Sequence, residues 1–386
     1  MLVEFVLTNP LLVAHFGPVM RALHARGHEA RFVSVPPPRW AGFDLRRKAA
    51  LHEQMVASAG RAGLPCARRI TAKANVAITA LASNELQFYT CRKLKFRYGV
   101  GFFRHGFHYN AAMSRGFDGV LVHGAFERDL FARWIDPVRI KLMGYPMFDA
   151  HVLAPTPKVE ARRMLGLDAA SGSRVIAYLP TWSHLSSLRP FARPMLDLAR
   201  KATVVVKPHA LSRFDATDRA ALKALRAAGA RVVHPATPLP IVVTAADLTI
   251  ADAVSGATPE SVLLAPDTPI VLLATRPVQE LFDEIALAGP VIGDSGALAS
   301  EIDRLGESDE YVASRRELAN RLFDRVDGHC AERAVNGIEE IARMPKVSAS
   351  PLLIERLFPW PAQVIRSRST ALRVASVRFG NLLGRR

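Results

Sequence analysis

The chain has 386 residues, of which 49% are hydrophobic, enough for two domains with sizeable cores and too many for extensive disorder. Its 51 basic and 35 acidic residues give a formal net charge of +16. Such an excess either favours a nucleic-acid, anionic-membrane or phosphorylated partner, or reflects an arginine-rich composition without a dedicated partner. No apolar run is long enough to span a bilayer, and the three cysteines have no CxxC or metal-ligand spacing, which favours a reducing compartment.

The N-terminal segment is predicted to form a β-α-β unit. Residues 2–8 are typical of a strand, not of a signal peptide, because no basic residue precedes the apolar run. Asn9-Pro10 is a helix-start signal, Gly27 is a helix-stop signal, and "EARFVSV" is the next strand. Further strands are expected at 119–123 and 139–143.

The composition changes around residues 151–173, where we expect an interdomain linker. A second series of apolar strands follows: "RVIAYLP", "ATVVVKPH", "ARVVHP", "ADLTIAD" and "TPIVLLA". Because helices alternate with these strands, the pattern predicts parallel sheets covered on both faces. The expected fold class is α/β, with two doubly wound, Rossmann-like domains at residues 1–155 and 165–345 that face each other across a cleft.

The segment 346–386 differs from both domains. It carries six arginines after Pro361 and no acidic residue after Glu355. On a helix, its apolar residues would form one face and its arginines the other. Such a helix could bind the surface of an anionic membrane, or its apolar face could pack back on the N-terminal domain.

Polar residues follow several of the predicted strands, at the edge where parallel sheets bind ligands. In the second half, these residues include Thr181 in "PTWSH", Lys207 and His209 in "KPH", and Asp252, Ser255 and Gly256 in "ADAVSG", with Glu260 in the next helix. The first half offers His105 and His108 in "RHGFH", and Gly144, Pro146 and Asp149 in "GYPMFD". Each also has a structural interpretation as a cap, turn or solvated charge. The turn 252–256 is either a plain connection or an anion-binding helix start.

In order and approximate spacing, these motifs resemble the CDP-glycerol glycerophosphotransferases, the teichoic-acid type of polymerase and primase. The resemblance covers roughly residues 100–340 and rests on "RHG", "GYPMFD", "PTWSH", "KPH", "ADAVSGATPE" and "DGHCAERAV". It implies a GT-B glycosyltransferase fold. Where the family has Asp-Tyr-Ser-Ser, this chain has Asp252-Ala-Val-Ser-Gly, so one hydroxyl is lost; His-Gly-Thr is replaced by His105-Gly-Phe.

The resemblance implies transfer of an activated group, glycerol phosphate in the family, from a CDP-linked donor to an acceptor hydroxyl of a cell-envelope polymer or lipid. His105 is then the candidate base, and His209 and Lys207 would stabilise the donor phosphates. Thr181, Asp252, Ser255, Gly256 and Glu260 complete the expected nucleotide site, with Asp252 orienting the turn. Neither a metal nor another cofactor is expected.

Two alternatives remain. The same fold could serve a nucleotide-sugar glycosyltransferase or a UDP-sugar epimerase. The positive charge also permits a nucleic-acid-binding protein, although no nucleic-acid motif is present and no such partner is expected. The expected location is the cytoplasm, with possible peripheral attachment of the tail to the inner face of the cell membrane.

Overall fold

The computed structural model describes residues 1–35, 45–71, 73–80, 86, 89–102, 104–168 and 172–347. The chain forms two compact units. Unit 1 contains residues 1–98, 105–149 and, among the described residues, 327–347, whereas unit 2 contains 99–104 and 150–326. No helix of the described residues is long and apolar enough to cross a membrane.

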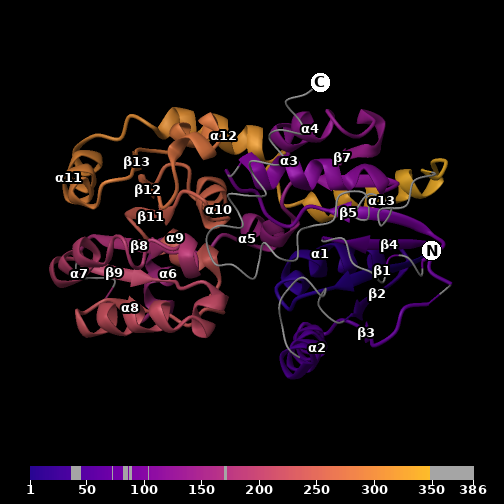
Figure 1. Cartoon of the computed structure of the whole chain (residues 1–386), viewed down its shortest axis with the longest axis horizontal. Coiled ribbons are helices and arrows are strands. Elements are labelled where there is room, and N and C mark those ends of the chain that lie inside the picture. The colour runs from indigo at the N-terminus through magenta and orange to yellow at the C-terminus, as the bar shows by residue number, and fades with distance from the viewer. Residues whose placement is uncertain are drawn as a thin grey trace. The chain divides into compact units, whose positions relative to one another are not determined.

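Unit 1 is built on a parallel sheet of seven strands in the order β3-β2-β1-β4-β5-β6-β7 (Figure 1). The strands are β1 (Leu2–Leu7), β2 (Glu29–Ser34), β3 (Cys66–Ala67), β4 (Val76–Thr79), β5 (Arg92–Phe96), β6 (Gly119–Val122) and β7 (Ile140–Leu142). The helices are α1 (Leu12–Ala25), α2 (Leu45–Arg61), α3 (Arg104–Ala112), α4 (Ala125–Phe131), α5 (Asp149–Leu153), which begins at the end of this unit, and α13 (Cys330–Arg343).

The predicted first β-α-β unit is present with a small shift. Asn9 lies before the helix, and its Oδ1 accepts a hydrogen bond from Leu11 N at 3.0 Å, so α1 begins at Leu12. Gly27 follows the helix with φ 75°, a left-handed conformation that favours glycine. The rings of Phe5, Phe16 and Phe32 meet in the core between β1, α1 and β2.

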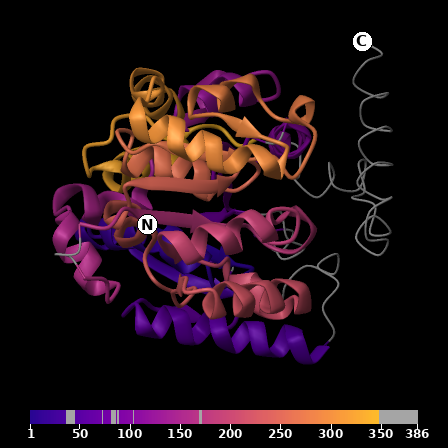
Figure 2. The same ribbon diagram turned by 90° about the vertical axis from the view of Figure 1, so that its left-hand side faces the viewer.

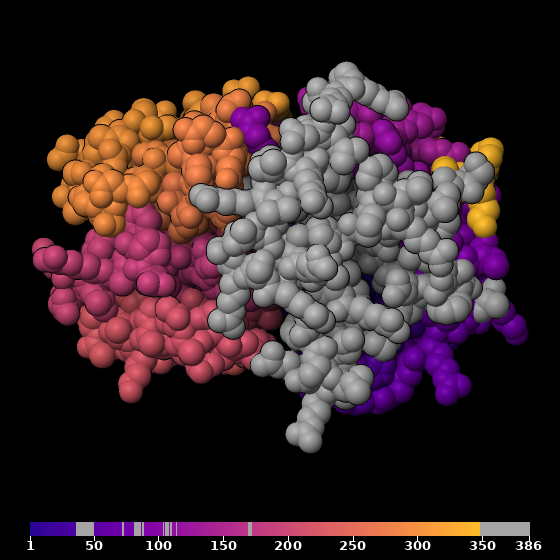
Figure 3. Space-filling model, in the orientation of Figure 1, coloured from indigo at the N-terminus to yellow at the C-terminus, as the bar shows by residue number. Residues whose placement is uncertain are grey.

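Unit 2 has a parallel sheet of six strands in the order β10-β9-β8-β11-β12-β13, with helices packed against it (Figures 1 and 2). The strands are β8 (Val175–Leu179), β9 (Thr203–Val206), β10 (Arg231–Val232), β11 (Leu248–Asp252), β12 (Ile270–Leu273) and β13 (Val291–Ile292). The helices are α6 (Lys158–Met164), α7 (Ala192–Lys201), α8 (Ala216–Ala227), α9 (Leu239–Ala245), α10 (Ala257–Leu264), α11 (Leu298–Glu307) and α12 (Val312–Leu322). In Figure 3, the rose residues of the α7–α8 half and the orange residues of the α10–α12 half lie on opposite sides of this unit.

Short 3-10 helices complete the connections. They are η3 (Met113–Gly116), η4 (Pro137–Arg139), η5 (Pro146–Phe148), η6 (Ser183–Leu185), η7 (Ala210–Phe214), η8 (Val278–Glu280), η9 (Asp283–Leu287) and η10 (Ser295–Ala297).

Helix α13 belongs to unit 1, although the predicted domain boundary placed residues 165–345 together. Its Ile338 and Ile341 are buried in the core of unit 1. Two glycines allow the close approach: a Cβ on Gly119 would lie 2.3 Å from Ile341 Cδ1, and one on Gly337 would lie 2.9 Å from Lys141 Cβ. The chain therefore returns to the first unit after completing the second.

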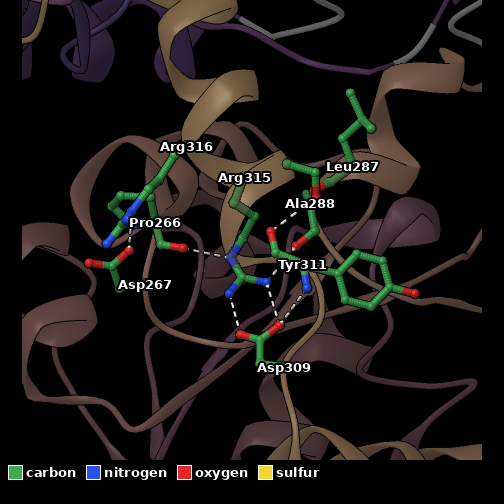
Figure 4. A network of polar contacts seen from close by, with 9 residues as sticks. Pro266, Asp267, Leu287, Ala288, Asp309, Tyr311, Arg315 and Arg316 are labelled. Carbon is green, nitrogen blue, oxygen red and sulfur yellow. Dashed lines mark hydrogen bonds and ion pairs between the residues drawn. The ribbon is translucent and has the colours of Figure 1, made fainter.

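A buried arginine holds the loops around α12 in unit 2. The Arg315 side chain is fully buried and pairs with Asp309 through both terminal nitrogens, while its Nε donates to Pro266 O at 2.7 Å (Figure 4). Its Nη1 also lies 3.3 Å from Ala288 O. Because removing one partner of a buried pair leaves the other charge unpaired, this network has a structural role and is separate from the site described below.

Candidate functional site

The predicted nucleotide residues gather at the topological switch point of unit 2. Strand β8 pairs with β9 on one side and with β11 on the other, so the connections after β8 and β11 leave the sheet in opposite directions (Figure 1). In parallel sheets, ligands bind beyond the carboxyl ends of the strands at this point. Thr181 follows β8, Lys207 and His209 follow β9, and residues 252–260 follow β11.

Asp252 joins the loops that follow β8 and β11. Its side chain is completely buried, and Oδ2 accepts hydrogen bonds from Thr181 N at 2.7 Å and Ser187 N at 3.1 Å. Within the described part of the chain, Oδ1 has no hydrogen-bond partner. Burial raises the pKa of Asp252 to about 7, against the lowering effect of these hydrogen bonds. At neutral pH the carboxyl group is therefore partly protonated, and its negative charge, which would repel a neighbouring phosphate, is reduced compared with that of an ordinary aspartate.

The turn after Asp252 uses most of its own hydrogen-bonding groups. Ser255 N donates to Asp252 O at 2.8 Å, and Ser255 Oγ accepts from Ala257 N at 3.2 Å. The hydroxyl group thus satisfies the N–H of the first residue of α10 and can still donate its own proton. Thr258 N lies 3.3 Å from Ser255 O, and Pro259 has no N–H. Among the described residues, this leaves the N–H of Gly256 without an acceptor. The turn thus offers fewer free N–H groups than the sequence suggested.

Gly256 is not required by the fold itself. Its φ is −63°, which any residue adopts, and an added Cβ would lie 3.7 Å from Val100 O, an ordinary contact. A need for glycine here would therefore come from a ligand that approaches the backbone closely.

Lys207 directly follows β9, and its ammonium group interacts electrostatically with Glu260 in α10. Its Nζ donates to Pro235 O at 3.0 Å. Burial lowers the pKa of Lys207, and the nearby Glu260 carboxylate opposes this effect, so the end of β9 and the first turn of α10 are electrostatically coupled. Lys207 therefore places a positive charge within electrostatic range of Glu260 in α10.

His209 is a neutral hydrogen-bond donor. Leu211 N donates to its Nδ1 at 3.1 Å, so in the neutral ring the proton is on Nε2. Burial, followed by the positive charge of Lys207, lowers the pKa of His209 to about 4. Its ring stacks on Trp182, with centroids 6.0 Å apart and an interplanar angle of 19°. At neutral pH, His209 can stabilise a phosphate by donating a hydrogen bond but carries no charge.

The predicted base is in the other unit. His105 lies in α3 and belongs to unit 1, but its side chain is outside the described residues. Its assignment as a base stays a prediction from the sequence.

A second polar cluster, which sequence reasoning missed, lies at the carboxyl edge of the sheet in unit 1. His123 follows β6, and its Nδ1 lies 2.9 Å from Glu127 Oε2, while Glu127 Oε1 pairs with Arg97 Nε at 3.0 Å. Burial by itself raises the pKa of Glu127, but His123 and Arg97 outweigh it and hold the pKa at about 2. Three buried, ionisable side chains from two strand ends and α4 are thus brought together.

Aromatic rings extend this cluster toward α1. The centroid of the Tyr145 ring lies 4.9 Å from that of His123 and 6.0 Å from that of His15. The centroids of the His15 and Tyr98 rings are 5.6 Å apart. Burial, followed by His123, lowers the pKa of His15 to about 3. A signal for His123 was present in the sequence, because this residue directly follows an apolar strand, but "VLVH" was interpreted as a strand only. His15 lies within α1 and had no such signal.

The "GYPMFD" motif has a structural role in unit 1. Asp149 accepts hydrogen bonds from Cys330 N at 3.1 Å and Ala331 N at 2.7 Å, which satisfies the first N–H groups of α13. Gly144 has φ 77°, where glycine is favoured. The turn and the acid of this motif therefore connect two segments that are far apart in the chain.

Comparison with solved structures identifies the fold. The chain aligns with the wall teichoic acid polymerase TagF over 88% of this chain and 89% of that chain, with 15% sequence identity and a TM-score of 0.55. The fold is of the GT-B type. A putative UDP-N-acetylglucosamine 2-epimerase from Listeria monocytogenes aligns at 13% identity over 88% of this chain and 95% of that one, with a TM-score of 0.58.

The S. aureus protein MnaA, solved with UDP, is similar at 12% identity over 90% of this chain and 99% of that one, with a TM-score of 0.59. No protein-family model matches the chain, and no curated protein matches it either. At these identities the likeness concerns the fold, two parallel α/β units of seven and six strands. Function must be argued from the site.

Proposed function

We propose that the chain is a transferase that moves an activated group from a nucleotide-linked donor to an acceptor hydroxyl. The finer proposal, taken from the motif resemblance, is transfer of glycerol phosphate from a CDP-linked donor to a cell-envelope polymer or lipid. The nucleotide would bind mainly to unit 2 and the acceptor mainly to residues 1–150.

The observation that carries the proposal is the donor set at the switch point of unit 2. Lys207 supplies a positive charge, and the Ser255 hydroxyl, the Gly256 N–H and His209 Nε2–H supply hydrogen bonds. Burial raises the pKa of Asp252 to about 7, so its carboxyl is only partly ionised at neutral pH. These groups suit the diphosphate of a nucleotide-linked donor, because negative charge increases on the leaving group as its bond to the transferred group breaks. For transfer of glycerol phosphate from a CDP-linked donor, the bond that breaks lies between the two phosphates and the leaving group is CMP. Without a donor, the negative charge of Glu260 favours the charged form of Lys207.

The acceptor hydroxyl must lose a proton during transfer. The proposal keeps His105 as the group that accepts it, since an imidazole titrates near neutral pH. His15 is less suited to this task, because a pKa of about 3 makes its ring a weak base. Its neutral ring and that of Tyr98 could instead contact the acceptor.

A nucleotide-sugar glycosyltransferase or a UDP-sugar epimerase is equally consistent with the fold, and the solved neighbours include both an epimerase and a polymerase. The deciding experiment measures thermal shifts with CDP-glycerol, CMP, UDP and UDP-N-acetylglucosamine, followed by turnover of each donor that binds. Stabilisation by CDP-glycerol and CMP, with release of CMP in the presence of an acceptor, supports the finer proposal. Selective binding and conversion of the UDP-sugar would replace it with the alternative.

A further inference from the structure

Trp182 is an exposed aromatic residue placed at the switch point of unit 2. It follows β8, the strand that pairs with both β9 and β11, and 38% of its surface is accessible to solvent. Tyr178, four residues earlier and within β8, is fully buried. A large aromatic side chain left open at a ligand-binding edge is more consistent with recognition than with core packing.

The loop that carries Trp182 is fixed from three directions. On either side of Trp182, the N–H groups of Thr181 and Ser187 donate to buried Asp252. Ser183 N donates to Asp218 Oδ2 at 3.0 Å, and Thr275 Oγ1 donates to Leu185 O at 2.7 Å.

Ser183 also has φ 59°, a left-handed conformation that costs free energy in a residue other than glycine. The surrounding hydrogen bonds hold this conformation. The indole is therefore held in place before any ligand arrives, so that little conformational entropy is lost on binding.

The position of the indole relative to the phosphate-binding groups indicates what it contacts. It stacks on His209, whose Nε2–H is available to a phosphate. A ligand with a planar ring on the exposed part of Trp182 would therefore have its phosphates near His209 and Lys207. In a nucleotide-linked donor, the planar ring is the nucleobase; a glycerol phosphate group has no planar face to stack.

We propose that Trp182 is a stacking platform for the nucleobase of the donor, an inference that rests on the proposed nucleotide site. Stacking uses the π-face that every base presents, so the platform fixes the position of a pyrimidine or purine without distinguishing them strongly. Selection among bases would then depend on other groups, and Trp182 would contribute affinity common to all nucleotides.

The test is equilibrium binding of CMP, UMP and inorganic pyrophosphate to the full chain and to the variants Trp182→Ala and Trp182→Phe. If the base stacks on Trp182, Trp182→Ala should weaken the binding of CMP and UMP by about 5- to 100-fold and leave the binding of pyrophosphate essentially unchanged. Trp182→Phe should keep most of the affinity for CMP and UMP, because it retains an aromatic ring. Trp134→Phe, in unit 1, is the matched control. Quenching of indole fluorescence by CMP in wild type, lost in Trp182→Phe, is an independent readout.

Three results would overturn the inference. Equal affinity of wild type and Trp182→Ala for CMP would exclude base stacking while leaving the proposed nucleotide site intact. Parallel loss of CMP and pyrophosphate binding would show that Trp182 acts only by positioning His209. Failure of wild type to bind any nucleotide, with a melting curve that shows folded protein, would instead refute the proposed function and this inference together.

Discussion

At the scale of single residues, the proton on His209 determines what this side chain can do. His209→Gln can place an amide N–H near the position of Nε2, whereas His209→Asn keeps an acceptor near Leu211 N but cannot reach the ligand. If the neutral Nε2–H is the functional group, His209→Asn should lower kcat/KM by about 10²-fold or more, and His209→Gln should retain much more activity. Because the pKa of His209 is about 4, the ratio of wild-type to His209→Gln activity should stay constant between about pH 5 and pH 8.

Melting temperatures of both His209 variants check that each is folded. Equal activity of the Asn and Gln variants would contradict the role of Nε2. A ratio that increases steeply as the pH falls through the ordinary histidine range would show that the charged ring is the active form.

Asp252 gives a prediction for stability against pH. Burial raises its pKa from 3.8 to about 7, so between these values the folded protein retains a proton that the unfolded chain releases. The contribution of this group to the free energy of unfolding therefore decreases as the pH rises from about 4 to about 7. In Asp252→Asn, the amide oxygen can still accept from Thr181 N and Ser187 N, but nothing ionises.

The measurement is the melting temperature of wild type minus that of Asp252→Asn as a function of pH. This difference should fall as the pH rises through that window. Asp215→Asn, which alters an exposed cap of α8, controls for the general effect of removing an aspartate. Curves of wild type and Asp252→Asn that run parallel across the window would contradict a raised pKa in the folded state.

At the scale of elements, a substitution at Gly256, before the first residue of α10, can show whether this glycine is needed for folding or for binding a ligand. Gly256→Ala places a Cβ where the fold has room, so the free energy of unfolding should change by less than about 1 kcal/mol. If a phosphate accepts from Gly256 N–H, the added methyl group should displace it and weaken CMP or UDP binding by about tenfold or more, the effect of losing a charge-assisted hydrogen bond.

Gly293→Ala is the matched control, because an added Cβ there meets no atom within 4 Å and the residue lies after β13 in the same unit. Nucleotide binding is measured by calorimetry and stability by denaturant unfolding. Unchanged affinity in Gly256→Ala would remove this turn from the phosphate site. A large loss of stability would show that the glycine has a structural role after all.

Elements also show why parts of the sheet escaped sequence reasoning. Strand β5 contains Arg92, Lys93 and Lys95, and such charges are unusual in a buried strand. Lys95 is nevertheless buried, with its ammonium group 5.5 Å from the centroid of the Phe117 ring. The neighbouring strands and this ring surround the charged side chain, and a local hydrophobic pattern does not contain them.

At the scale of the whole molecule, the alternation of apolar strands and helices was sufficient to predict two parallel α/β units. The return of α13 to unit 1 was not predictable from that alternation, since it depends on Gly119 and Gly337 accepting close neighbours and on Asp149 capping the helix. Local sequence patterns are limited in the same way for the prediction of functional sites. Residues that follow strands within one unit could be grouped by topology, but the contact of Glu127 with Arg97 depends on tertiary packing.

The arginine-rich tail is the remaining large feature of the chain, and its predicted helix lies outside the described residues. Its six arginines after Pro361 could each contribute about 1 kcal/mol of attraction to an anionic surface, decreasing with salt. Together they would support reversible peripheral binding, which suits an enzyme whose acceptor is held at a membrane. The competing prediction is that the apolar residues of the tail pack on unit 1 and stabilise it.

Deletion of residues 361–386 distinguishes these two roles. If the tail attaches the protein to a membrane, the truncated chain should lose binding to vesicles containing anionic lipid and keep its melting temperature. Binding of the full chain to these vesicles should weaken as salt is added, because salt screens the attraction. A variant with the six arginines replaced by glutamine is the matched control, since it retains the apolar residues. If the deletion lowers the melting temperature strongly while vesicle binding persists, the tail packs on the folded chain and the basic surface that binds lipid lies elsewhere.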